Sequence, residues 1–391
     1  MSVLQRVFSF RFKLALFLFL FPSVAFAQHY VETDLVSSIP LIGTNATNGH
    51  DTQLVNAWGL TRSATSPWWI SDNGTGFSGL YNGVGTKNTG VNPTIPVPAG
   101  VTTHSAPTGV VFNGTATDFL LPSGASARFI FVTEDGVIAG WSSGAAAVIA
   151  KDNSSKGAVY KGCTIAEWNG KHYLYATNFH SGEIEVYDST FTRVHLERNA
   201  FQNDDDDFDS DHERHDGDDR HDGDDRRHRF VPFNVQAIGN NLFVTFAKQD
   251  ADNHDEVDGA GLGDVGVFSP GGRLRARLQH GSWMNAPWGA AMAPGEFGEF
   301  SHAVLVGMFG SGQIAAFNPV NGRFLGLMEN HDGSNLSIDG LWALGFGAGN
   351  TNSGPYNTLY FTAGPNGESD GTFGTLTVDP ATPELAEVDE P

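Results

Sequence analysis

The sequence predicts an all-β fold, a single six-bladed β-propeller of four-stranded antiparallel blades, and three observations carry this prediction. Glycine and phenylalanine account for 48 and 29 of the 391 residues, a composition typical of short strands joined by tight turns. A glycine followed five residues later by a large apolar residue recurs six times along the chain. Each copy follows a second strand-like run, so each pair predicts a β-hairpin.

The repeat locates the strands of each blade in order. The third strands follow Gly76, Gly136, Gly182, Gly263, Gly312 and Gly371. The second strands are expected at 68–71, 129–133, 173–177, 242–247, 303–309 and 358–364. An inner strand precedes each hairpin and is clearest at 56–60, 106–112, 285–291 and 339–345. Outer strands follow, for example at 94–98 and 192–196. One motif repeated six times favours a propeller over a β-sandwich.

The two ends of the chain predict how the ring closes. After Val378 only an acidic, proline-containing tail at 379–391 follows, so the sixth repeat lacks an outer strand. The segment Tyr30–Val36 has an alternating pattern and no partner in the first repeat. We therefore expect this N-terminal strand to pair near Gly371–Val378 and complete the last blade.

The first 27 residues have the pattern of a cleaved secretory signal peptide. Basic residues precede an apolar run at 14–21, and Ala25-Phe26-Ala27 fits a small-x-small cleavage site. An apolar run of this length is too short to span a bilayer, which needs about 20 residues. We expect a secreted or periplasmic protein with no membrane span after cleavage, and a propeller at 28–378.

The net charge of the chain limits the classes of partner that it is expected to bind. The formal net charge is −22, which disfavours nucleic acid and favours cations or basic proteins. Cys163 is the one cysteine in the sequence, so an intrachain disulfide is impossible. A monomer is expected.

An acidic segment at 203–229 interrupts the repeat. Gly182 and Gly263 are 81 residues apart, whereas the other repeat intervals are 46 to 60 residues. The segment therefore reads as an insertion between blades three and four. It holds twelve Asp and one Glu between Asp204 and Asp225, which predicts disorder because there is little to bury. Weak cation capture by its carboxylates is the alternative function.

An up-and-down meander brings the start of every inner strand, and the turn after every second strand, to one end of the ring. Oxygen-bearing side chains there are candidate metal ligands, with Ca²⁺ the expected ion: Asn56, Asn285, Asp339 and Asp72. Other polar residues are candidates for a ligand-binding face: Asn73, Glu134, Asp135, Asn178, His180, Gln249, Asp250, Asn366 and Glu368. For each of these residues the alternative is a hydrogen bond to nearby backbone.

Several motifs resemble a family of secreted, uncharacterised bacterial proteins with a propeller fold, some of which carry a C-terminal sorting signal. The motifs are Asn56-Ala-Trp-Gly, Ala247-Lys-Gln-Asp250, Asn285-Ala-Pro-Trp-Gly-Ala, Gly307–Ile314 and Ile338-Asp-Gly-Leu-Trp342. The resemblance covers nearly all of 30–378, departs at 203–229, and implies fold and export but no reaction. More distantly, the architecture is similar to NHL-repeat and gluconolactonase-like propellers, some of which are calcium-dependent hydrolases.

Three functions remain open from the sequence. The first is a binding module whose acidic channel mouth engages a cation, a small molecule, a basic partner or a glycan. The alternative is a divalent-metal-dependent hydrolase or lyase with a metal at the channel, for which Asp339 or Asp72 would supply the base. A surface-assembly component is compatible as well. No nucleophile–base motif is present to decide whether the protein is an enzyme.

Overall fold

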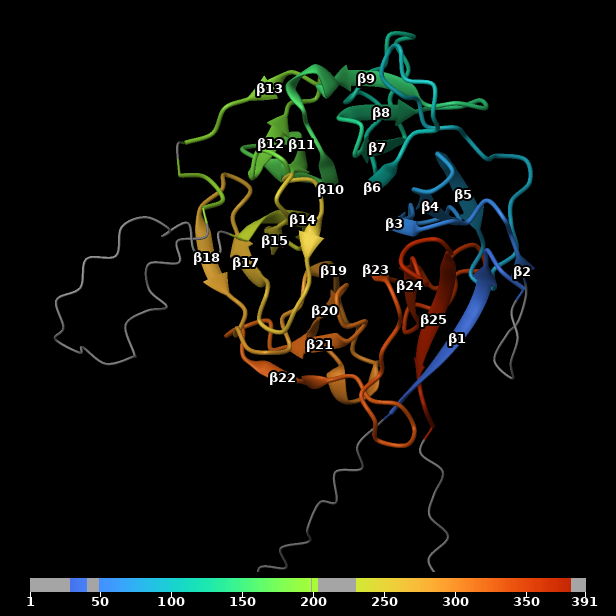
Figure 1. Ribbon diagram of the computed structural model, residues 1–391, viewed down its shortest axis with the longest axis vertical. Coiled ribbons are helices and arrows are strands. Elements are labelled where there is room, and N and C mark those ends of the chain that lie inside the picture. The colour runs from blue at the N-terminus through green and yellow to red at the C-terminus, as the bar shows by residue number, and fades with distance from the viewer. Residues whose placement is uncertain (1–28, 41–48, 198, 203–229, 381–391) are drawn as a thin grey trace, which may run out of the picture.

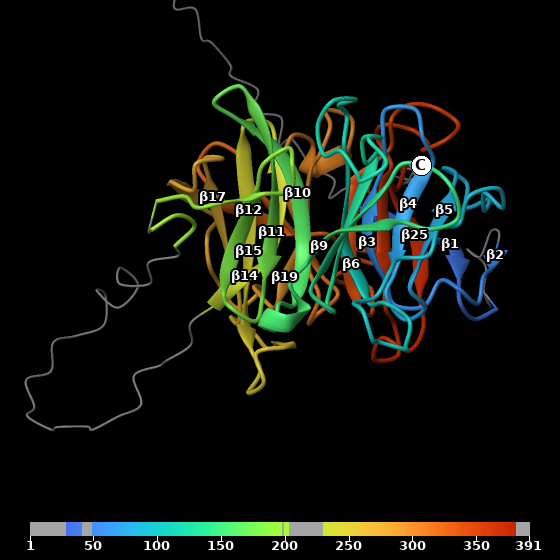
Figure 2. The same ribbon diagram turned by 90° about the horizontal axis from the view of Figure 1, so that it is seen from above.

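The computed structural model describes residues 29–40, 49–197, 199–202 and 230–380. In this part of the chain the strands form six sheets, arranged as a ring around a central axis (Figure 1). Seen from the side, the strands of each sheet run roughly along that axis (Figure 2). The six-bladed propeller expected from the repeat is confirmed. The predicted signal peptide at 1–27, the insertion at 203–229 and most of the tail lie outside the described residues.

Each blade is an antiparallel meander that runs from the axis outward. Blade one contains β3 (Ala57–Thr61), β4 (Trp68–Asp72) and β5 (Phe77–Tyr81). Blade two contains β6 (Pro107–Phe112), β7 (Phe129–Thr133), β8 (Val137–Trp141) and β9 (Val148–Asp152). Blade three contains β10 (Tyr160–Trp168), β11 (Lys171–Asn178), β12 (Glu183–Tyr187) and β13 (Arg193–Val194).

The second half of the ring follows the same plan. Blade four contains β14 (Phe230–Ile238), β15 (Asn241–Gln249), β17 (Asp264–Phe268) and β18 (Leu274–Arg277), with β16 (Glu256–Val257) paired to β15. Blade five contains β19 (Pro287–Met292), β20 (Val304–Met308), β21 (Ile314–Phe317) and β22 (Phe324–Leu327). Blade six contains β23 (Leu341–Phe346), β24 (Leu359–Ala363) and β25 (Thr372–Val378).

The N-terminal strand closes the ring. β1 (Tyr30–Ser37) is antiparallel to β25, from Tyr30 opposite Val378 to Ser37 opposite Thr372, and the two strands lie side by side in Figure 1. A short β2 (Gly49–His50) extends this sheet. The expected closure is confirmed. The hydroxyl of Tyr30 also donates to the carbonyl of Phe297 at 3.0 Å, which ties the closing strand to blade five.

Blade one departs from the four-stranded pattern. Its sheet has three strands among the described residues, and the segment expected as its outer strand makes isolated bridges instead. The backbone of Thr94 bridges Phe77 of blade one and also Ala146 of blade two. Because Thr94 shares its hydrogen bonds between two blades, this segment cannot form a regular edge strand.

The inner strands approach one another closely around the axis. A Cβ atom on Gly59 would lie 2.3 Å from the carbonyl oxygen of Thr108, and one on Gly289 would lie 2.4 Å from that of Trp342. Only glycine permits this contact between neighbouring blades. A cluster of buried aromatic rings packs around the axis: Trp58, Phe179, Phe233, Trp288 and Trp342. These rings pack against one another across the axis, next to the polar groups at one end of the inner strands.

Among the described residues, no helix is both long enough and apolar enough to cross a membrane.

Candidate functional site

The inner strand of every blade contains a bulge at an equivalent position, and in five blades the bulged residue belongs to the aromatic cluster at the axis or contacts it. The register shift falls between Ala57 and Leu60 in β3 and recurs in the other inner strands. A bulge redirects a side chain that the regular ladder would point elsewhere. The residues at these positions are Trp58, Thr108, Lys161, Phe233, Trp288 and Trp342. Lysine therefore occupies, in blade three, a position that is aromatic in four other blades.

Lys161 is the centre of the polar network at the end of the channel. Its side chain is 0% exposed. The ammonium donates to Glu134 of blade two, and to Oδ1 of Asp255 of blade four at 2.9 Å. It also lies 5.1 Å from the ring centre of Trp58, within cation–π range. Burial alone would lower the pKa of Lys161, but the charges of the surrounding carboxylates raise it. The ammonium is therefore a permanent cation inside the protein.

A chain of amide and carboxylate groups continues this network around the ring. Nδ2 of Asn56 donates to Glu368 at 2.6 Å and to Oδ1 of Asn73 at 3.3 Å. Asn73 donates in turn to Oε2 of Glu134 at 2.9 Å. Oδ1 of Asn56 accepts from the indole of Trp342 at 2.9 Å. Asn56 adopts φ of 45°, a left-handed conformation that asparagine tolerates. The network links blades six, one and two to the lysine of blade three.

The mouth carries more negative than positive charge. We define the channel mouth as Asn56, Asn73, Glu134, Lys161, Asp255, Glu256 and Glu368. Its four carboxyl groups surround one ammonium. Burial, with repulsion from Glu368 and Asp255, raises the pKa of Glu256 to about 7 despite the attraction of Lys161. Burial and the charge of Glu134 likewise raise the pKa of Glu368. For Asp255 the attraction of Lys161 outweighs burial and lowers the pKa.

The four residues predicted as metal ligands do not meet at one point. Asn56 lies in the mouth, whereas Oδ1 of Asn285 accepts from the backbone of Gly259 at 2.6 Å. Asp339 is exposed, and its Oδ2 accepts from the backbone of Asn366 at 2.9 Å. Asp72 is fully buried, and its carboxyl interacts with Asp51 and Lys87 rather than with the mouth. The calcium site expected from these four residues remains a prediction that this geometry does not favour.

The predicted ligand-binding face divides into two groups. Asn73, Glu134 and Glu368 belong to the mouth. The remaining residues bond to nearby backbone or side chains. Asp135 accepts from the backbone of Ala106, Asn178 accepts from Val159, Gln249 donates to the carbonyl of Phe179, Asp250 accepts from the backbone of His254, Asn366 donates to Asp370, and His180 is exposed. Asp135, Asn178, Gln249 and Asp250 thus make the hydrogen bond to backbone that the sequence left as the alternative, whereas Asn366 bonds a side chain and His180 is exposed.

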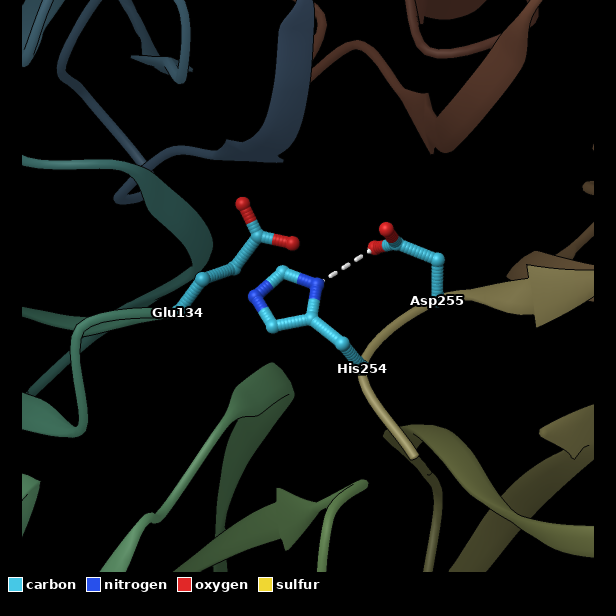
Figure 3. A group of neighbouring side chains, drawn as sticks. All are labelled: Glu134, His254 and Asp255. Atoms are coloured by element: carbon cyan, nitrogen blue, oxygen red, sulfur yellow. Dashed lines mark hydrogen bonds and ion pairs between the residues drawn. The ribbon is translucent and has the colours of Figure 1, made fainter. Parts of the chain in front are cut away.

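Sequence reasoning missed Lys161 and the three residues His254, Asp255 and Glu256. An alignment of the six inner strands would have found Lys161, because it stands where other repeats have an aromatic residue followed by a small one, as in Trp288-Gly289. The other three lie in the long turn at 249–264. The acidic composition of this turn is evident from the sequence, but its approach to the axis of the ring is not. Glu134, His254 and Asp255 offer ligand atoms within 4.8 Å of one another. Figure 3 shows the imidazole of His254 lying between the two carboxylates.

The fold and the mouth define the class of protein: a six-bladed β-propeller with an acidic, lysine-centred channel mouth. No family model matches the chain. Uncharacterized protein R640 of Acanthamoeba polyphaga mimivirus is 30% identical over 242 residues, which cover 60% of this chain and 41% of the viral protein. Uncharacterized protein R648 of the same virus is 27% identical over 345 residues, 86% of this chain and 78% of that protein. The match thus spans about two fifths of the first relative.

Solved structures agree on the fold. A streptogramin B lyase structure covers 91% of this chain and 100% of its own, with 11% identity and a TM-score of 0.50. At this identity the likeness shows the propeller fold alone. The sequence relatives are viral, and neither comparison identifies a secreted bacterial family.

Proposed function

We propose that this protein is a binding module whose channel mouth binds a cation or a cationic group of a partner. One observation carries the proposal: four carboxyl groups from blades two, four and six surround a single buried ammonium. With all groups ionised the cluster carries three excess negative charges. Burial, and to a lesser degree repulsion between the carboxylates, raises the pKa of Glu256 and Glu368, and an additional cation at the mouth would relieve the repulsive part.

The aromatic residues favour a cation over a glycan as the ligand. Trp58, Trp288 and Trp342 are at most 4% exposed, and Trp58 stacks on Trp342 with ring centres 3.7 Å apart. These rings are buried and present no exposed face on which a sugar could stack. The sequence resemblance to secreted propellers and the pattern of residues 1–27 support export as part of this proposal, with a cation or basic partner met outside the cytoplasm.

Calorimetric titration tests the proposal, with CaCl₂ and a tetralysine peptide as probes. Glu368→Gln removes one mouth carboxylate, and Glu167→Gln is the matched control because Glu167 is exposed near the other end of the strand that carries Lys161. Glu368→Gln should weaken binding of at least one probe about tenfold, equivalent to about 1.4 kcal/mol. The control should bind as the unaltered protein does. Equal effects of the two substitutions, or no binding of either probe, would contradict the proposal.

The acidic segment at 203–229 complicates this titration, because its carboxylates also attract cations. The same pair of substitutions should therefore be repeated in a chain that lacks 203–229. The difference between Glu368→Gln and Glu167→Gln should persist there. A difference confined to the full chain would show that the binding belongs to the segment and not to the mouth.

A metal-dependent hydrolase or lyase is the second candidate, and one observation favours it. A carboxyl group with a pKa of about 7, as in Glu256, can exchange protons near neutral pH. Turnover of a panel of lactones and esters, with and without chelator, tests this function. Turnover that is abolished both by chelator and by Glu256→Gln would support the enzyme function. Absence of turnover by the unaltered protein, with or without chelator, would refute it.

A further inference from the structure

The turn at 249–264 of blade four brings a histidine to the mouth beside two carboxylates. His254 and Asp255 are neighbours in this turn, and Glu134 follows β7 of blade two. One ligand atom from each residue lies within 4.8 Å of the other two. We propose that Glu134, His254 and Asp255 bind a divalent transition-metal ion of the Zn²⁺ type. This inference rests on the proposed cation-binding function and identifies its cation.

The donor set selects the class of metal. Ca²⁺ and Mg²⁺ prefer sites made entirely of oxygen, whereas an imidazole with carboxylates suits Zn²⁺ and its neighbours Co²⁺ and Ni²⁺. Three protein ligands leave one position of a tetrahedral zinc site open to water or to a partner group. Ligand atoms in such a site are about 3.3 Å apart. His254 and Asp255 are exposed residues of a turn, so a small closing movement would bring the three atoms to this spacing.

The two carboxylates of the triad are already held by groups outside it. Lys161 bonds to both Glu134 and Asp255 from inside the channel, where its side chain is 0% exposed. Oε2 of Glu134 also accepts from Asn73 at 2.9 Å. Such outer contacts orient metal ligands before the ion arrives.

The histidine is positioned as well. Nδ1 of His254 lies 2.9 Å from Oδ1 of Asp255, and its backbone amide donates to Oδ1 of Asp250 at 2.8 Å. Nδ1 of His254 and Oδ1 of Asp255 are therefore already close to the spacing that two ligand atoms have around one zinc ion.

The charge of the mouth separates this triad from an ordinary surface cluster. Glu256 and Glu368 add two carboxyl groups next to the triad, and Lys161 is the one cationic side chain that contacts it among the described residues. The buried ammonium therefore holds the ligands in place without neutralising them. A dication bound on the solvent side of Lys161 would cancel most of the remaining charge.

Zinc titration of the full chain tests the inference. Metal-free protein is titrated with ZnCl₂, and with CoCl₂ to follow visible absorption. The unaltered chain is compared with His254→Gln, Glu134→Gln and the matched control His180→Gln, an exposed histidine in the turn after β11. The histidines of 203–229 are the same in every variant, so any ion that they bind cancels and the difference between variants reports the mouth.

His254→Gln should bind about one Zn²⁺ fewer per chain than the unaltered protein, and the Co²⁺ spectrum of one site should disappear. His180→Gln should bind as many Zn²⁺ ions as the unaltered protein and keep the Co²⁺ spectrum of that site. Glu134→Gln should behave like His254→Gln, but it also removes a partner of Lys161 and could unfold the chain. His254 is exposed, so its variant keeps the test valid. Equal zinc stoichiometry and affinity in His254→Gln and the unaltered protein would overturn the inference.

The two proposals fail in distinguishable ways. If His254→Gln leaves zinc binding unchanged while Glu368→Gln still weakens binding of Ca²⁺ or tetralysine, the metal site is refuted and the cation-binding mouth stands. If none of the mouth substitutions alters binding of any probe, both are refuted.

Discussion

Replacement of Lys161 by methionine tests how the channel mouth is held together. Methionine keeps most of the aliphatic packing of lysine and removes only the ammonium. In the native protein this ammonium contacts Glu134 of blade two and Asp255 of blade four. Without it, the carboxylate of Glu134 would remain in a site where its side chain is 13% exposed. We therefore expect Lys161→Met to destabilise the propeller.

The magnitude follows from the burial of each partner. Asp255 is 61% exposed at its side chain, so its pair with Lys161 contributes little, within about 0–1 kcal/mol. The pair with Glu134 is buried on both sides, and removal of one member of such a pair costs about 3–5 kcal/mol. The contact with Trp58 is part of the same loss. A total of about 3–5 kcal/mol corresponds to a fall in Tm of about 4–7 °C for a domain of this size.

A double-mutant cycle separates the ion pair from general damage. Unfolding free energies are measured in urea for Lys161→Met, Glu134→Gln and the double variant. If the buried charges are coupled, the double variant should be at least about 1 kcal/mol more stable than the sum of the single effects predicts. Lys87→Met is the control for a more exposed lysine, whose side chain is 23% exposed. Additive effects, or a loss below about 1 kcal/mol for Lys161→Met, would refute a buried ammonium as the organising charge.

Three other predictions concern the scaffold. Burial and the neighbouring Asp34 raise the pKa of Glu32 in β1 to about 7, so the native state binds its proton more tightly and stability falls as pH rises from about 4.5 to about 7. In urea titrations Glu32→Gln should therefore raise the unfolding free energy by about 1–2 kcal/mol at pH 8 but leave it unchanged at pH 4.5. Equal gains in stability at the two pH values would contradict this prediction. Gly59→Ala should lower the unfolding free energy by about 2–4 kcal/mol, measured by thermal unfolding, because its Cβ atom would meet the backbone of Thr108. The control Gly114→Ala should change stability little, because the nearest atom to its Cβ would be 3.6 Å away. Equal losses of stability in the two variants would disprove the close approach of the inner strands. Deletion of 203–229 should leave Tm unchanged or raised, and a fall of more than about 5 °C would show that the segment packs on the ring.

The scaffold of this protein could be predicted from its sequence. Six glycine-led hairpins predicted six blades, and the spare strand Tyr30–Val36 predicted the pairing that β1 makes with β25. These features could be predicted because they depend on local sequence: the alternation of apolar and polar residues, the turn residues and the number of strand-like runs. The outer edge of blade one was the exception. Thr94 divides its hydrogen bonds between two blades, and such sharing leaves no mark on a strand pattern.

The choice of polar residues that form the mouth could not be predicted without the three-dimensional structure. Asn56, Asn73, Glu134 and Glu368 were predicted to share one end of the ring, and they do form one network. Asp72 was predicted with them, but the pleat of β4 directs its carboxyl toward Asp51 and Lys87. Lys161 was not predicted, because a bulge between Tyr160 and Gly162 turns it toward the axis. A shift of one residue in register reverses the direction of a side chain, and register depends on contacts between segments that are distant in the sequence.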